Sequence, residues 1–363
     1  MFELTNEQRR CLGLSLVCET WKKVAVEGKY GADSVYAFLD GRRIVKVISV
    51  SDIPGQETYN EFDIDQMLSP CGTMLLSKTE KGKPKKLTAS NLMKANGNGM
   101  QFYCCRGYVG IVNLATQQQY YFSEYDSVEV KNFEDLSRWL EEWCRDTGEK
   151  ELAEIRAFAQ RKRVHQKFKE GDFFRYRIRR NLYGYGRILV DYAKLRKDGI
   201  PFWDIFAGKP LCIAVYHIVT ENANVPIEEL ASLKMLPSQM IADNAFYYGE
   251  FEIVGNMPIS PNEENYTIHY GKSISFLTPD HVCYQRGKKF VSLDGAEALF
   301  GNFINNGIGY FLNATREILL ACIRENLNDP FWEMAPPIDT DRNLRNPKYQ
   351  KELAQIKVQV GDI

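Results

Sequence analysis

The spacing of apolar residues predicts mainly β-strands in the first part of the chain. β-Branched and aromatic residues fill positions 33–39 and 43–50 on either side of Asp40-Gly41, and this pattern is typical of a β-hairpin. The glycine-rich stretch at 96–100 is expected to be a turn, because its glycines do not follow a strand and open a helix as a nucleotide-binding motif requires. A meander of three short strands is expected next, at 101–105, 109–115 and 119–123.

Helical signals occur at three places in the same part. Thr5 to Gln8 has the pattern of a capping box, so a short helix is expected there. Asn132 is expected to cap a helix whose apolar residues form one stripe, and a second helix is expected at 149–164. Because this helix ends in a basic, polar stretch at 161–167, we place a domain boundary there.

Strands also dominate the next part of the chain. After a turn at Gly171-Asp172, apolar residues alternate with Arg175, Arg177 and Arg179, which predicts a half-buried strand with an exposed basic row. Further strands are expected at 183–191, 211–219, 245–254, 265–270, 281–285 and 288–292. Further helices are expected at 226–236, 294–305, 309–327 and 347–356.

These elements predict an α+β fold, because strands outnumber helices and cluster in hairpins. The 363 residues suffice for two domains, since single cores stop growing near ~250–300 residues. We predict domains at 1–165 and 166–335, each with an antiparallel, strongly bent or barrel-like sheet and segregated helices. Residues 336–363 are expected to form a tail with a short helix.

Composition narrows the environments and partners that we expect. The formal net charge is -1, so the chain as a whole has no attraction to nucleic acid or to an anionic membrane. The nine cysteines are odd in number, with two adjacent at 104 and 105, which is not the pattern of a disulfide framework. No apolar run approaches the ~20 residues of a membrane helix, and the first residues lack the features of a secretory signal. We therefore expect a cytoplasmic protein without a membrane partner.

Nucleophile, nucleotide and metal patterns are not found in the sequence. The four histidines, at 165, 217, 269 and 281, show no metal-ligand spacing, so neither a metal nor another cofactor is expected. His217 is either a core histidine or a pocket base, and a base would need a second polar group within hydrogen-bond reach. If the chain is an enzyme, His217, Glu250 and Arg187 are the candidate catalytic residues.

Two basic clusters allow an alternative in which the protein binds a nucleic-acid backbone. One cluster lies at 81–86, and the other runs from 161 to 179 with Tyr183 and Tyr185 nearby. A solvated helix end and a solvated strand face account for the same charges, and acidic residues elsewhere offset them. A nucleic-acid partner is therefore not expected.

A polar and aromatic face is the candidate partner-binding site. On the strand at 183–191, two tyrosines and Arg187 share one face, and the glycines at 184 and 186 leave room for close packing on the other. If the strand at 245–254 is its neighbour, Arg187 can pair with Glu250. Tyrosine, tryptophan and arginine are the residue types that dominate interface energetics. The candidate partner-binding residues are Tyr183, Tyr185, Arg187, Trp203, Tyr248, Glu250 and Glu252.

Residues 168–256 resemble the immunity protein 26 family, which is also associated with HocA-type phosphotriesterases. The similar segments are Gly171-Asp172-Phe173-Phe174, Tyr185-Gly186-Arg187-Ile188, Tyr216-His217 and Tyr248-Gly249-Glu250-Phe251. They span about a quarter of the chain, and we expect the same domain to continue to about residue 330. The resemblance assigns no activity to the N-terminal part.

The resemblance implies a bacterial protein that binds and neutralises a cognate polymorphic toxin. Two faces are open as docking surfaces: the basic row at 175, 177 and 179 against an acidic toxin surface, or Glu250 and Glu252 in the phosphate site of a nuclease. Two other functions stay open, a hydrolase of phosphotriesters or phosphoesters and a nucleic-acid-binding protein. Trp203 and its aromatic neighbours either anchor the partner or cover the sheet.

Overall fold

The computed structural model divides into two units, Met1–Val164 and His165–Ile363. Both contain helices and antiparallel sheets, which confirms the predicted α+β class. The sheets of the described residues are not closed barrels, because their first and last strands do not pair. The described residues are 2–26, 34–70, 74–78, 81–123, 128–199, 209–233, 235, 239–260, 268–272, 282–286, 289–292, 351 and 354.

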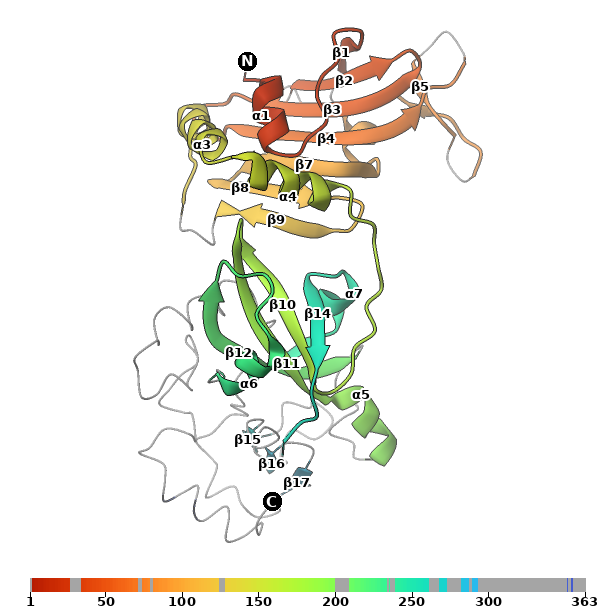
Figure 1. Ribbon diagram of the computed structural model, residues 1–363. Helices are drawn as coiled ribbons and strands as arrows, with labels where there is room; N and C mark the ends of the chain where they lie inside the picture. Colours follow the sequence, from red (N-terminus) through yellow and green to blue (C-terminus); the bar gives the residue numbers. More distant parts are fainter. Residues whose placement is uncertain are drawn as a thin grey trace. The chain divides into compact units, whose positions relative to one another are not determined.

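Unit 1 is built on a seven-stranded antiparallel sheet in the order β1-β2-β3-β4-β7-β8-β9 (Figure 1). The strands are β1 (Lys22–Val26), β2 (Ser34–Asp40), β3 (Arg43–Ser51), β4 (Thr58–Met67), β7 (Gly97–Cys105), β8 (Tyr108–Asn113) and β9 (Gln118–Phe122). A small hairpin of β5 (Leu75–Leu76) and β6 (Lys85–Lys86) is inserted between β4 and β7. The predicted hairpin at Asp40-Gly41 and the predicted meander are confirmed.

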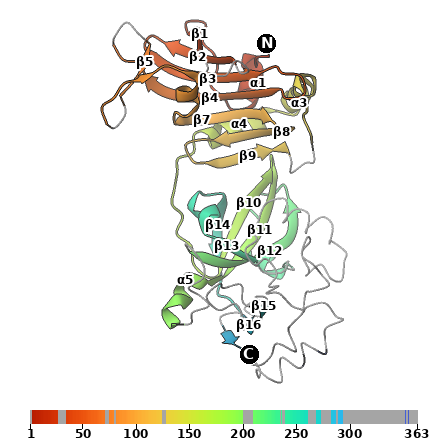
Figure 2. The same cartoon turned by 180° about the vertical axis from the view of Figure 1, so that it is seen from behind.

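Helices cover both faces of this sheet. Helices α1 (Asn6–Cys11), α3 (Phe133–Arg145) and α4 (Glu149–Ala159) contribute to the core of one face, and α2 (Ala89–Met93) to the core of the other. Figure 2 shows the sheet from behind, with its strands in front of α3 and α4. Both predicted caps are present: Thr5 Oγ1 accepts from the backbone N–H of Gln8 at 3.2 Å, and Asn132 Oδ1 accepts from that of Asp135 at 2.8 Å.

The expected turn at 96–100 is wrong, because most of this stretch begins β7. Gly97 lies opposite Ile64 of β4 in the antiparallel ladder. A Cβ atom on Gly97 would lie 2.3 Å from the side chain of Leu114 and 2.9 Å from that of Phe62. Close packing within the strand therefore requires glycine at position 97, and the glycines of this stretch do not mark a turn.

A buried ionic cluster lies between α1 and the sheet of unit 1. Glu61 accepts from Arg9 Nε at 2.8 Å and from the hydroxyl of Tyr59 at 2.5 Å. Lys46 Nζ lies 2.7 Å from Glu61 and 2.8 Å from Asp63, and the side chains of Lys46 and Glu61 are fully buried. Burial by itself raises the pKa of Glu61, but the charges of Lys46 and Arg9 outweigh it and hold the pKa below its usual value.

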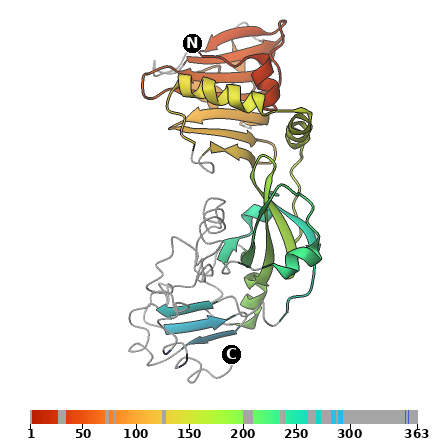
Figure 3. The same cartoon turned by 60° about the vertical axis from the view of Figure 1, so that its left-hand side comes forward.

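Unit 2 contains a five-stranded antiparallel sheet in the order β13-β12-β11-β10-β14 and a three-stranded sheet in the order β15-β16-β17, drawn in blue in Figure 3. The strands are β10 (Asp172–Arg179), β11 (Leu182–Asp191), β12 (Pro210–Thr220), β13 (Gln239–Ala242), β14 (Phe251–Asn256), β15 (Ile268–Lys272), β16 (Val282–Arg286) and β17 (Lys289–Ser292). The helices are α5 (Tyr192–Leu195), α6 (Ile227–Ser232) and α7 (Asn244–Tyr247), and a 3-10 turn spans Arg196–Asp198.

Both faces of the five-stranded sheet are packed. We call them the α6 face and the α7 face, after the helix that contributes to each core. Buried residues of the α6 face include Phe173, Tyr185, Leu189, Tyr216 and Leu230. Buried residues of the α7 face include Phe174, Tyr176, Ile188, Ile213 and Phe246. Gly184 and Gly186 make room on the α7 face, since a Cβ atom there would lie 2.2 Å from the ring of Tyr176 or 2.3 Å from that of Phe174.

Two expectations for unit 2 are corrected by this topology. The single strand expected at 245–254 is helix α7 followed by β14, with Gly249 at φ +72° between them. The strands at β11 and β14 are not neighbours, because β10 lies between them. The helices expected at 294–305 and 309–327 lie outside the described residues. Of the helix expected at 347–356 within the tail 336–363, residues 351 and 354 are described and are helical.

Candidate partner-binding site

Four side chains from three strands form what we call the arginine–tyrosine cluster, which consists of Arg175, Arg177, Tyr183 and Glu252. Arg177 of β10 lies directly opposite Tyr183 of β11. Its guanidinium carbon is 5.2 Å from the centroid of the Tyr183 ring, and that of Arg175 is 5.4 Å from the same centroid. All four side chains are partly exposed. Two cations therefore hold the ring in place and leave part of it accessible.

Arg175 is held by an ion pair with Glu252. Its Nη2 lies 2.5 Å from Glu252 Oε2, and the two side chains are 20% and 29% exposed. Arg175 Nη1 also donates to the backbone carbonyl of Ala223 and to Asn224 Oδ1 at 3.5 Å. The basic row is thus less exposed than expected, and one member of the expected acidic face neutralises one of its arginines. The side chain of Arg179 lies outside the described residues.

Tyr185 lies in the core of the α6 face, although the sequence suggested a surface position. Its exposed fraction is 0%. The hydroxyl donates to the backbone carbonyl of Asn222 at 2.7 Å and accepts from the backbone N–H of Val225 at 3.4 Å. Burial raises the pKa of Tyr185 above its usual value. In this conformation Tyr185 is a packing residue that cannot meet a partner.

Arg187 is also buried, with 2% of its surface exposed. Its Nη2 donates to the carbonyls of Met257 at 2.6 Å and Pro258 at 2.8 Å, and its guanidinium carbon lies 4.5 Å from the ring centroid of Phe173. The expected pairing with Glu250 is wrong, because strand β10 separates Arg187 from β14. Arg187 instead binds the chain where it leaves β14.

The turn at Gly171-Asp172 holds the same segment, residues 256–258. The backbone N–H of Met257 donates to the carbonyl of Gly171 at 3.1 Å, and Asn256 Nδ2 donates to Asp172 Oδ1 at 2.7 Å. Gly171 has φ +84°, and a Cβ atom there would lie 2.3 Å from the carbonyl oxygen of Met257, so this close approach requires glycine. Two of the segments that carry the family resemblance therefore stabilise the fold of unit 2.

Tyr248 and Glu250 lie in the connection between α7 and β14, and both are partly buried. The ring of Tyr248 lies 5.2 Å from that of Tyr247 in a perpendicular arrangement. Phe246 and Phe251, which flank this connection, pack into the core of the α7 face. Glu250 immediately precedes β14 and lies two residues before Glu252 of the arginine–tyrosine cluster. Trp203 lies outside the described residues.

His217 is partly buried on β12, between Tyr216 of the α6-face core and Ile218. By strand alternation it faces the same side as Val215 of the α7-face core, whereas Arg187 lies on the α6 face. The candidate catalytic set is therefore not assembled on one face. Within the part of the chain that the structure describes, no group of three or more His, Cys, Asp or Glu side chains is placed to hold a metal ion.

The loop between β12 and α6 is the part of the site that the sequence did not reveal. Its backbone carbonyls at Asn222 and Ala223 accept from Tyr185 and Arg175. A backbone acceptor has no signature in a side-chain pattern. The asparagines at 222 and 224 indicate a loop but do not indicate what the loop contacts.

Comparison with known proteins identifies a family for this part of the chain. The family model of immunity protein 26 matches residues 169–276, which confirms the resemblance and includes the arginine–tyrosine cluster. No curated protein and no solved structure matches the chain. Among the helices that the structure describes, none has both the length and the apolar character needed to cross a membrane.

Proposed function

We propose, from the match of residues 169–276 to immunity protein 26, that this protein is a bacterial immunity protein whose second unit binds and neutralises a cognate toxin. The match supports an immunity role in general. Neutralisation by direct binding is our inference, and the partner it requires is a toxin protein. A binding protein of this kind needs a surface that is rigid before the partner arrives.

The arginine–tyrosine cluster has the properties of such a surface. Tyrosine and arginine are enriched at the energetic centres of interfaces. Tyr183 is held between Arg175 and Arg177, so less side-chain entropy is lost when a partner orders it. Arg175 is itself fixed by Glu252. We infer that this cluster is the docking contact of unit 2.

The charges of the cluster favour an acidic toxin surface over a phosphate site of a nuclease. The cluster contains two arginines and one glutamate, and Arg175 forms an ion pair with Glu252. A carboxylate that imitates a phosphate would have to turn toward the toxin, and Glu252 already binds an arginine. We therefore expect charge reversal at Arg177 to weaken binding strongly.

The test begins by capturing the partner with the full chain from a lysate of the producing strain. The captured protein is identified, expressed alone and purified, and its affinity for the chain is measured by calorimetry. Tyr183→Ala and Arg177→Glu should each weaken binding about 30-fold or more, as expected for residues worth about 2 kcal/mol at the centre of an interface.

Tyr247→Ala is the matched control. Tyr247 is a tyrosine of the same unit, 40% exposed, on helix α7. Its loss should change the affinity less than about threefold, in line with most interface or surface positions. If both cluster variants bind the toxin as tightly as the wild type, the cluster is not the docking contact. If no captured protein inhibits bacterial growth when expressed alone, the proposed function is wrong.

A further inference from the structure

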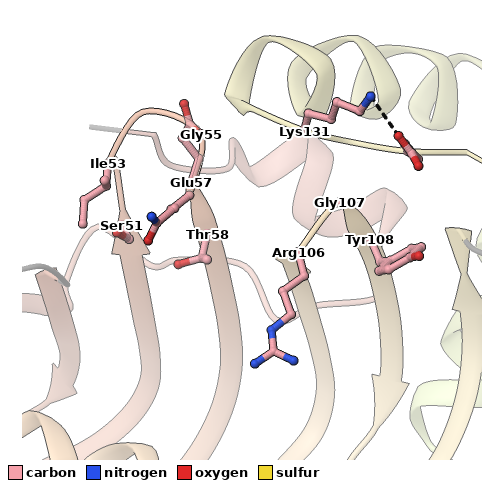
Figure 4. Close-up of a pocket in the computed structure, with 11 residues that line it drawn as sticks. Ser51, Ile53, Gly55, Glu57, Thr58, Arg106, Gly107, Tyr108 and Lys131 are labelled. Carbon is pink, nitrogen blue, oxygen red and sulfur yellow. Dashed lines mark ion pairs between the residues drawn. The ribbon is translucent and has the colours of Figure 1, made fainter.

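A pocket of about 720 Å³ lies at the end of the unit 1 sheet where tight turns join β3 to β4 and β7 to β8 (Figure 4). Ser51, Ile53 and residues 55–58 at the first connection line one side, and Arg106, Gly107 and Tyr108 of the second turn line the other. Glu129 and Lys131, from the stretch before α3, complete the lining. The volume falls within the range of about 300–1,000 Å³ that is typical of small-molecule sites.

The walls of this pocket are preformed. In the first connection, Gln56 N–H donates to the carbonyl of Ile53 at 2.9 Å, with Pro54 and then Gly55 at φ +77° between them, which is a type II turn. In the second turn, Arg106 and Gly107 have φ +52° and +84°, which is the type I′ pattern of a two-residue hairpin. The pocket therefore does not need to fold around a ligand.

Among the residues that the structure describes, two of the four charged groups that line the pocket have no charged partner. Lys131 and Glu129 pair with each other at 3.0 Å. Glu57 immediately precedes β4 and Arg106 immediately follows β7, its antiparallel neighbour, and neither forms an ion pair within the described part of the chain. The Oε2 atom of Glu57 is buried and has no hydrogen-bond donor among the described residues. A buried acceptor of this kind costs free energy until a donor reaches it.

We propose that this pocket binds a small zwitterion of the amino-acid or short-peptide class. The ammonium group of the ligand donates to the carboxylate of Glu57, and its carboxylate accepts from the guanidinium of Arg106. An anion alone would leave Glu57 without a donor, and a cation alone would leave Arg106 without an acceptor. The hydroxyls of Ser51 and Thr58 also line the pocket and are available to polar atoms between the two ends. This site is independent of unit 2 and of the toxin.

Calorimetric titration of the full chain with L-alanine, Ala-Ala and Ala-Ala-Ala tests the proposal and separates an amino acid from a peptide. The N-acetylated and the C-amidated forms of each ligand remove one charge at a time. At least one free zwitterion should bind, and each blocked form should bind about tenfold to 150-fold more weakly, as expected for loss of one charged hydrogen-bond contact.

Glu57→Gln and Arg106→Gln should weaken binding of the free ligand by the same range. Glu57→Gln should also leave the melting temperature of the empty protein unchanged or raise it, because a buried carboxylate without a donor is replaced by a neutral amide. Arg138→Gln, at an exposed arginine of α3 outside the pocket, is the control and should bind normally. The proposal is overturned if no ligand binds at millimolar concentration, or if the blocked forms bind as well as the free ones.

Discussion

Replacement of Arg187 by methionine separates a folding role from a docking role. Arg187→Met keeps a long side chain in the α6-face core and removes the guanidinium. The carbonyls of Met257 and Pro258 then lose their donor, and the ring of Phe173 loses its cation. We expect the five-stranded sheet of unit 2 to be destabilised while the surface of the arginine–tyrosine cluster stays intact.

The expected loss can be estimated from these contacts. Two hydrogen bonds from a charged donor contribute about 1.5–3 kcal/mol each, and a desolvated cation–π contact contributes about 2 kcal/mol. Methionine avoids the desolvation of the guanidinium, which costs several kcal/mol. A net destabilisation of about 2–4 kcal/mol follows. Because every 1.4 kcal/mol is a factor of ten, amide exchange that requires opening of unit 2 should become about 30-fold to 700-fold faster.

Hydrogen–deuterium exchange read by mass spectrometry resolves this effect within the chain. Peptides from β11 and β12 should exchange faster in Arg187→Met, and peptides from β3 and β4 serve as the internal reference. Arg177→Met removes a partly exposed arginine from the same strand pair and should change the exchange of β11 less than about threefold. Unchanged exchange of β11 and β12 in Arg187→Met, together with loss of toxin binding, would refute a folding role for Arg187.

Three further predictions concern charge, thiols and glycine. The pKa of Glu61 is lowered in the folded protein, so its contribution to stability is present above about pH 4.3 and is lost as pH falls through the pKa of the folded state. The melting temperature, measured as a function of pH, should show this loss in the wild type and a smaller loss in Glu61→Gln. Burial raises the pKa of Cys104 to about 12, whereas a hydrogen bond lowers that of exposed Cys18, so brief alkylation at pH 8 should label Cys18 first and Cys104 last by peptide mapping. Gly186→Ala should lower the free energy of unfolding of unit 2 by about 1–3 kcal/mol, because its Cβ would lie 2.3 Å from the ring of Phe174. Urea denaturation should show this loss as a lower midpoint.

Local signals in the sequence predicted local structure correctly. The capping residues Thr5 and Asn132 begin the helices that they were expected to begin. The alternation at Phe174 and Tyr176 identified the buried side of β10. In each of these cases the determining contacts lie within a few residues along the chain, or the period of two fixes which side chains share a face.

Contacts between distant segments could not be predicted in the same way. Periodicity showed that Tyr185 and Arg187 share a face, but it could not show that a loop and residues 256–258 cover that face. The position of β10 between β11 and β14 depends on pairing across about 80 residues, for which one sequence has no signal. The error at 245–254 had a visible cue, since Gly249 interrupts the alternation at the point where α7 ends.

Growth of a bacterium that expresses the captured toxin, with and without this chain, tests the central claim most directly. Cells that carry the toxin and the wild-type chain should grow as cells without toxin do, and cells that carry the toxin with Arg177→Glu should be inhibited although that variant is folded. Inhibition that the wild-type chain does not relieve would contradict the claim that unit 2 neutralises a toxin.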